Sequence, residues 1–187
     1  MTNIARVRRK KGPALRLVRG GRGEIPFGSL RVTLSPPDAP IAAIVLEEDT
    51  WLVLSAEPEM KPPVGGMVRI MTDLLKAEPM APGSVVVVSG EPLRMLAIVY
   101  DLAGEPICRP EWVGEALQGV LAVAEEKGLA ILALPLLGVR HGRLPVARFA
   151  ELLAEAVRKT PPRSLRRVWL MATEQEGQEL RRLLAAA

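Results

Sequence analysis

The sequence predicts a single α/β domain with three layers, in which a mixed β-sheet lies between helices. In the second half of the chain, short apolar runs alternate with amphipathic helical patterns, as in parallel strands joined by helices. In the first half, several β-rich runs follow one another, which indicates a sheet that is not parallel throughout. With 187 residues, of which 49% are hydrophobic, the chain is long enough for one sizeable core.

The first half contributes strands and one helix. Gly23 precedes the first expected strand, and a Ser-Pro-Pro-Asp turn at 35–38 ends it. An acidic triplet, Glu47-Glu48-Asp49, separates the second strand from the third. Apolar residues at helical spacing follow Gly65 and Gly66. We therefore expect strands over 25–34, 41–46, 51–54, 84–88 and 95–102, and a helix over 64–77.

The second half alternates helices with strands. An amphipathic helix over 111–126 ends before Gly128, and a helix over 146–159 begins after Pro145. A closing helix has acids in its first turn and Arg181 and Arg182 in its last turn, as the helix dipole favours. The remaining expected elements are strands over 129–134 and 165–171 and this closing helix over 174–184.

Charge divides the chain into a tail and a body. Residues 1–23 contain eight basic residues and no acid, whereas the whole chain carries +4, so residues 24–187 carry −4. We expect a basic, flexible tail over 1–23 and one domain over 24–187. The tail is either a contact arm for nucleic acid or an acidic partner, or a solvated extension that aids solubility.

Composition narrows the class of protein. No apolar run reaches the roughly 18 residues of a membrane span, and no signal-peptide core follows Lys11. The lone Cys108 excludes an internal disulfide and a cysteine metal cluster, which favours a cytoplasmic protein with no metal and no cofactor. Asn occurs once and Gln three times, which is typical of heat-adapted proteins and also of a GC-rich genome.

Two loops carry the candidate chemistry, and each follows an expected strand and leads to an expected helix. Such loops hold anionic ligands in α/β proteins because backbone amides at a helix N-terminus face the ligand. The first loop offers Ser55, Ala56 and Glu57, then Gly65, Gly66, Met67 and Val68 at a helix start. The second loop offers Gly138, Val139, Arg140, His141 and Gly142. These twelve residues are the predicted ligand-binding set, and no catalytic residue is assigned.

In this order the motifs resemble the macro domain family, an ADP-ribose-binding α/β/α module, over about residues 50–184. Residues 52–57 look like the family's Ile-Val-Asn-Ala-Ala-Asn strand end, and Gly65-Gly66-Met67-Val68 looks like its Gly-Gly-Gly-Val helix start. Residues 135–140, with Gly142 and Pro145, are similar to its Pro-Ala-Ile-Gly-Thr-Gly loop. The resemblance implies a macro-like fold with a mixed central sheet that binds ADP-ribose or a related phosphorylated nucleotide.

Several ligand-contacting positions of the family pattern differ. Leu54 and Glu57 stand where the pattern has Asn, and Arg140 replaces the second Gly of the later loop. Arg140 either pairs with phosphate or fills the diphosphate space. The Gly-Ser-Leu run at 28–30 lacks the acid of the family's adenine-contacting motif, and the nearest acids are Asp38 and Asp49.

Two other functions stay open. The scaffold is alternatively degenerate and acts as an interaction module, with the basic tail contacting nucleic acid or an acidic partner. The other alternative is a hydrolase acting on ADP-ribosylated substrates, with Glu57 or His141, the only histidine, activating water. The loop residues do not support hydrolysis, because the Asn-rich motif that accompanies it in the family is missing.

Overall fold

The computed structural model describes residues 24–54 and 78–185. Their strands form one seven-stranded sheet in the order β1-β2-β7-β6-β3-β5-β4. The five inner strands are parallel, and the edge strands β1 and β4 are antiparallel to their neighbours. The strands are β1 Ile25–Phe27, β2 Leu30–Thr33, β3 Ala43–Asp49, β4 Val85–Val88, β5 Leu93–Tyr100, β6 Ile131–Pro135 and β7 Arg167–Met171.

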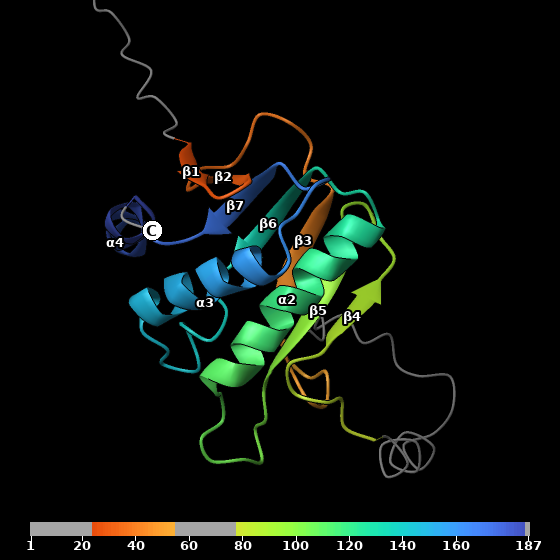
Figure 1. The fold of residues 1–187 in the computed structure, drawn as a ribbon. Helices are drawn as coiled ribbons and strands as arrows, with labels where there is room; N and C mark the ends of the chain where they lie inside the picture. The colour runs from red at the N-terminus through yellow and green to blue at the C-terminus, as the bar shows by residue number, and fades with distance from the viewer. Residues whose placement is uncertain (1–23, 55–77, 186–187) are drawn as a thin grey trace, which may run out of the picture.

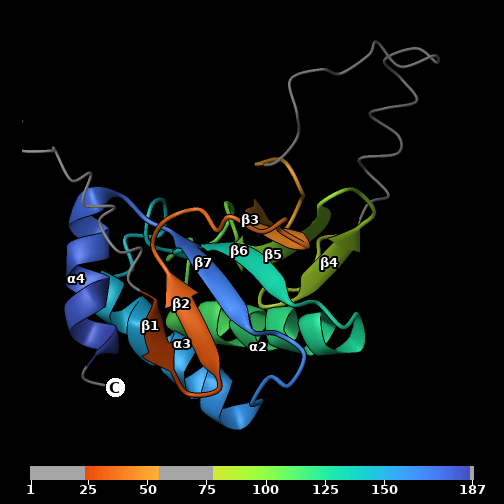
Figure 2. The ribbon, with the colours of Figure 1, turned by 90° about the horizontal axis from the view of Figure 1, so that it is seen from above.

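Three helices accompany this sheet in the described residues: α2 Pro110–Glu126, α3 Val146–Lys159 and α4 Glu174–Leu184. Helices α2 and α3 run side by side across one face of the sheet, and α4 lies beyond the β1 edge, against α3 (Figures 1 and 2). The bounds of these helices agree with the sequence prediction. The helix expected over 64–77 lies outside the described residues.

The core lies between the sheet and the two helices, and it follows the alternation of each strand. Val45 on β3 and Met95 on β5 are fully buried in this core, and Phe149 is the fully buried aromatic residue of α3. Burial of an aromatic side chain of this size stabilises a fold by about 3–5 kcal/mol relative to alanine. Because apolar residues recur on one stripe of each helix, sequence periodicity locates this part of the core.

Two strand predictions in the first half are wrong. The strand expected over 25–34 is a hairpin of β1 and β2, in which Gly28 takes the positive φ of 56° that the turn requires. The strand expected over 51–54 is a turn after β3, and the acidic triplet expected to separate two strands is the end of β3 itself.

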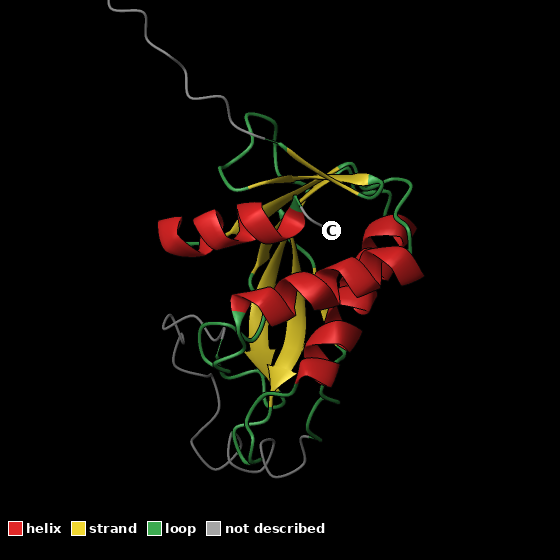
Figure 3. Cartoon of the chain, turned by 60° about the vertical axis from the view of Figure 1, so that its left-hand side comes forward, coloured by secondary structure: helices red, strands yellow, loops and turns green. Residues whose placement is uncertain are grey.

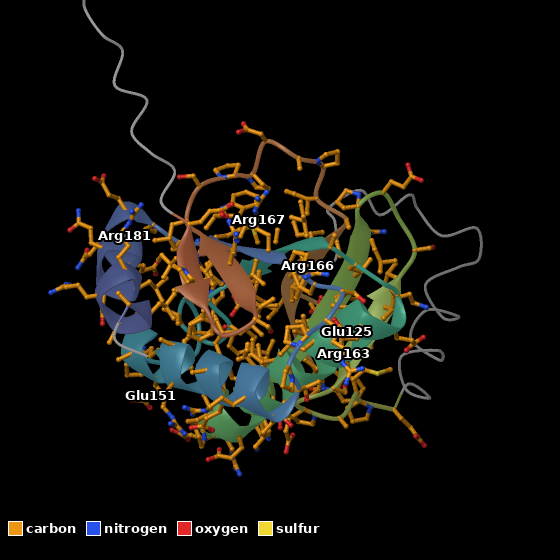
Figure 4. The ribbon with its side chains drawn as sticks, turned by 45° about the horizontal axis from the view of Figure 1, so that its top comes forward. Glu125, Glu151, Arg163, Arg166, Arg167 and Arg181 are labelled. Carbon is orange, nitrogen blue, oxygen red and sulfur yellow. The ribbon has the colours of Figure 1, made fainter. Side chains whose placement is uncertain are left out.

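Polar contacts fasten the connections around the core. The Glu125 carboxylate on α2 accepts backbone N–H groups of Arg163, Ser164 and Leu165, at 2.8, 2.8 and 3.2 Å. Figure 4 shows Glu125 beside Arg163, in the segment that leads into β7. Thr173 begins α4 with reciprocal bonds to Glu176. Among the described helices, none combines the length and apolar character needed to cross a membrane.

Candidate functional site

The parallel strands β3, β5, β6 and β7 end at the same edge of the sheet, where several loops gather (Figure 3). In open α/β sheets this edge is the usual place for a ligand, because strand ends and helix N-termini converge there. Of the predicted site residues, the structure describes Gly138, Val139, Arg140, His141 and Gly142, in the loop between β6 and α3. Ser55, Ala56, Glu57, Gly65, Gly66, Met67 and Val68 lie outside the described residues.

The loop between β6 and α3 is closely packed at its two glycines. Gly138 is buried, has φ +78°, and accepts a hydrogen bond from the Leu144 N–H at 3.0 Å. A Cβ added at Gly142 would lie 2.7 Å from the Sγ of Cys108. Both positions therefore favour glycine: Gly138 because of its positive φ and the space around it, and Gly142 because of the space alone.

The amide of Gly138 already has an anionic partner. Its N–H donates to Oε1 of Glu47, at the end of β3, with an N···O distance of 2.6 Å. The Tyr100 hydroxyl, at the end of β5, donates to the same oxygen at 2.8 Å. Hydrogen bonds to a carboxylate are stronger than neutral ones. Glu47 thus links β3, β5 and the loop that the sequence assigns to a ligand oxyanion.

The surroundings of Glu47 disfavour further negative charge. Burial raises the pKa of Tyr100, and the charge of Glu47 raises it further. Burial likewise raises the pKa of the Cys108 thiol to about 11, with Glu47 adding to the effect. At neutral pH both groups stay protonated, so Cys108 is a packing residue under the loop and not an activated nucleophile.

Two cavities adjoin Glu47. The smaller, of about 190 Å³, is lined by Glu47, Arg140 of the loop and Glu176 of α4, together with apolar side chains. The larger, of about 420 Å³, is lined by Glu47, His141 and apolar residues that include Met171 at the end of β7. Its volume lies in the range of small-molecule sites. The two cavities share Glu47, Pro135 and Met171, so they lie next to each other.

Arg140 and His141 are both exposed, so their side chains reach solvent from the walls of these cavities. Arg140 lines the smaller cavity without being buried in it. The His141 ring meets the Tyr100 ring edge-on, with 6.0 Å between centroids. Arg140 therefore places a positive charge at the mouth of the smaller cavity.

Acidic side chains also fold the turn that follows β3. Asp49 accepts the N–H groups of Trp51, Val53 and Leu54, at 2.7, 2.8 and 3.1 Å. Glu48, which is fully buried, accepts the Leu54 N–H at 2.7 Å. Burial alone would raise the pKa of Asp49, but these backbone donors together lower it below its ordinary value. Leu54, which the resemblance compares with an Asn of the family, belongs to this turn and lines the larger cavity.

The strand that the structure places before residues 55–77 is β3, which extends to Asp49, and residues 51–54 form a turn. Sequence reasoning missed Glu47 and Tyr100, although a carboxylate directly after an apolar strand was the available signal.

A larger hollow, of about 750 Å³, lies over β3, β4 and β5, lined by Ile44, Leu46 and Arg94 among others. Ile44 and Leu46 alternate along β3 with Val45, which belongs to the core under α2 and α3, so this hollow opens on the other face of the sheet. This volume is that of the described residues alone. None of the residues of the loop from Gly138 to Gly142 lines this hollow. Within the described residues, no group of three His, Cys, Asp or Glu side chains is arranged to hold a metal ion.

No family model and no curated protein matches the sequence. Solved structures do share its fold. The Oceanobacillus iheyensis macrodomain with ADP has a TM-score of 0.64 and 11% identity, over 88% of this chain and 95% of that chain. A mutant of that macrodomain with ADPR has a TM-score of 0.61 and 12% identity, over 88% and 97%. The Trypanosoma brucei macrodomain in complex with ADP has a TM-score of 0.56 and 12% identity, over 82% and 68%.

These likenesses establish the architecture. The chain has the α/β/α macrodomain fold with a mixed central sheet, as the sequence motifs predicted. At 11–12% identity, the chain shares the fold of these macrodomains, but its side chains at the strand ends need not match theirs. What this chain binds therefore has to be argued from its own site.

Proposed function

We propose that this chain binds ADP-ribose or a related phosphorylated nucleotide at the carboxyl edge of its sheet. The observation that carries the proposal is the pair of adjoining cavities at the ends of β3, β6 and β7, bordered by the loop from Gly138 to Gly142. Structures of the same fold were solved with ADP and with ADPR, which supports a ligand of this class. Ser55–Glu57 and Gly65–Val68, predicted from sequence as the opposite wall, stay part of the proposal.

The two cavities suit different parts of such a ligand. The larger one has mostly apolar walls with His141 at one side, and its volume of about 420 Å³ accommodates a nucleoside. The smaller one has Arg140 at its mouth, which supplies positive charge for a phosphate. We expect Arg140 and loop amides other than the Gly138 N–H, which Glu47 accepts, to contact the phosphates while the larger cavity takes the base or a ribose.

A thermal-shift panel tests this proposal. ADP-ribose, mononucleotides and poly-ADP-ribose are added to the wild-type chain and to Arg140→Gly. Binding to the folded state alone stabilises it by about 2.7 kcal/mol at one hundred times the dissociation constant. We expect ADP-ribose to raise the Tm of the wild type, and Arg140→Gly to lose most of this shift. No shift for either protein at millimolar ADP-ribose would refute the proposal, whereas a larger shift for Arg140→Gly would show that Arg140 obstructs the site.

A second candidate function rests on the eight basic residues of the segment 1–23, which precedes a body of net charge −4. In this alternative the domain is an interaction module, and the segment contacts nucleic acid or an acidic protein. RNA binding that weakens steeply with salt and disappears on deleting residues 1–23 would support it. RNA binding of equal strength without the segment would contradict it. We propose no hydrolase activity, because the loops lack the Asn-rich motif that accompanies hydrolysis in the family.

A further inference from the structure

Glu47 lines both cavities, and only one of its two carboxylate oxygens binds the loop between β6 and α3. Its Oε1 accepts both the Gly138 N–H and the Tyr100 hydroxyl. Within the described residues, no hydrogen bond or ion pair involves its other oxygen, Oε2. Glu47 is partly buried and lines both cavities. One carboxylate oxygen therefore occupies the loop amide, and the other meets no partner among residues 24–54 and 78–185, which leaves it facing the cavities there.

We infer that Glu47 is the specificity-determining residue of this site, because its carboxylate acts as an internal anion in the place of a ligand oxyanion. The inference rests on the proposed function, in which a ligand phosphate approaches the same loop. A phosphate reaching Gly138 has to displace a charge-assisted bond of 2.6 Å and lie beside a like charge. The wild-type site thus disfavours a phosphate at this position and favours a neutral hydrogen-bond donor, such as a ribose hydroxyl, at Oε2.

The other charged and polar groups around Glu47 do not cancel the repulsion between its carboxylate and a phosphate at Gly138. Tyr100 donates a hydrogen bond to Glu47 but carries no charge, since burial and Glu47 itself raise its pKa. Glu176 adds a second carboxylate to the smaller cavity, although its Oε2 is bonded to the start of α4. Arg140 is the cation lining that cavity in the described residues, and its side chain is exposed. Among the described residues that line the smaller cavity, two carboxylates therefore face one cation where the phosphate would lie.

Two substitutions separate the charge of Glu47 from its contact with the loop. Glu47→Gln keeps an oxygen that accepts the Gly138 N–H and removes the negative charge. Glu47→Ala removes both the charge and the contact. Glu151→Gln, on the exposed surface of α3, is the matched control, because it changes the net charge equally outside both cavities. Circular dichroism and Tm verify that each variant is folded.

Isothermal titration calorimetry with ADP-ribose and with inorganic pyrophosphate measures the outcome. We expect Glu47→Gln and Glu47→Ala to bind ADP-ribose at least tenfold more tightly than the wild type, and Glu151→Gln to bind like the wild type. Equal or weaker binding by both Glu47 variants, with the wild type binding, overturns the inference and leaves the proposed function intact.

The pyrophosphate titration distinguishes the two hypotheses where ADP-ribose binds to no protein. Pyrophosphate binding that appears only in the Glu47 variants would then support the inference and refute the proposed function. Binding of neither ligand by any folded variant overturns both. Glu47→Gln keeps the test decisive if Glu47→Ala is unstable, because its shape and its acceptor for Gly138 are retained.

Discussion

Replacing Gly138 by alanine tests whether the loop between β6 and α3 is held by packing or only by its backbone conformation. Gly138 has φ +78°, and an added Cβ would lie 3.0 Å from Val113 Cγ2 and 3.1 Å from Cys108 Sγ. Gly128, at the end of α2, has φ +64°, but an added Cβ there meets nothing within 4 Å. The two substitutions share the backbone penalty of about 1–2 kcal/mol. Only Gly138→Ala adds overpacking, at about 1–3 kcal/mol.

The difference between the two variants is therefore the quantity to measure. We expect Gly138→Ala to unfold at a Tm roughly 2–12 °C below that of Gly128→Ala, since 1 kcal/mol corresponds to about 2–4 °C in a domain of this size. Differential scanning calorimetry of both variants and the wild type gives the result directly. Equal Tm values for the two variants would refute the described packing of Gly138 against α2 and Cys108.

Three further predictions follow from the contacts of single side chains. Tyr100→Phe removes the hydroxyl that donates to Glu47 at 2.8 Å, so denaturant unfolding should show a loss of about 1.5–3 kcal/mol. Glu125 accepts three backbone N–H groups, which outweigh desolvation and lower its pKa below the ordinary 4.5. The Glu125 carboxylate stabilises the fold fully above pH 4.5, and this stabilisation is lost as the pH falls through the lowered pKa of the folded state. Glu125→Gln should therefore make the Tm fall less between pH 7 and pH 3. The control Glu126→Gln should leave this fall unchanged. The pKa of Cys108 is raised from 9.0 to about 11, so its thiolate population at pH 8 is roughly 100-fold lower than in the unfolded chain. Thiol labelling of the native protein should therefore be slower by at least that factor. Equal labelling rates in buffer and in guanidinium would contradict the burial of Cys108.

Most of the fold could be predicted because periodicity and helix boundaries are local signals. Pro145 before α3 and the acidic first turn of α4 mark where helices begin, and the structure places both helices at the predicted bounds. The hairpin of β1 and β2 was missed because its turn depends on the single Gly28 with positive φ, inside a run that looks uniformly β-rich. Local patterns do not specify such a turn unless a stronger pair of turn residues is present.

The site could be predicted only in part, because its contacts join distant parts of the chain. The loop from Gly138 to Gly142 was identified from its own residues, and the structure places it at the end of the sheet. Its partner Glu47 is 91 residues away in sequence, and Tyr100 is 53 residues from Glu47. An acidic triplet after an apolar run was interpreted as the break between two strands. Only the register of β3 against β5 reveals that these acids extend the strand.

The three acids at the end of β3 order the loops that follow β3 and β6. Glu47 binds the loop that follows β6, while Glu48 and Asp49 satisfy the N–H groups of the turn that follows β3. Each carboxylate thus takes over backbone donors that would otherwise be left to water or a ligand. The same interactions that order the site also give it negative charge. We therefore expect stability of the loops and affinity for a phosphate to oppose each other in this chain, so that substitution of Glu47 favours the ligand at the expense of the fold.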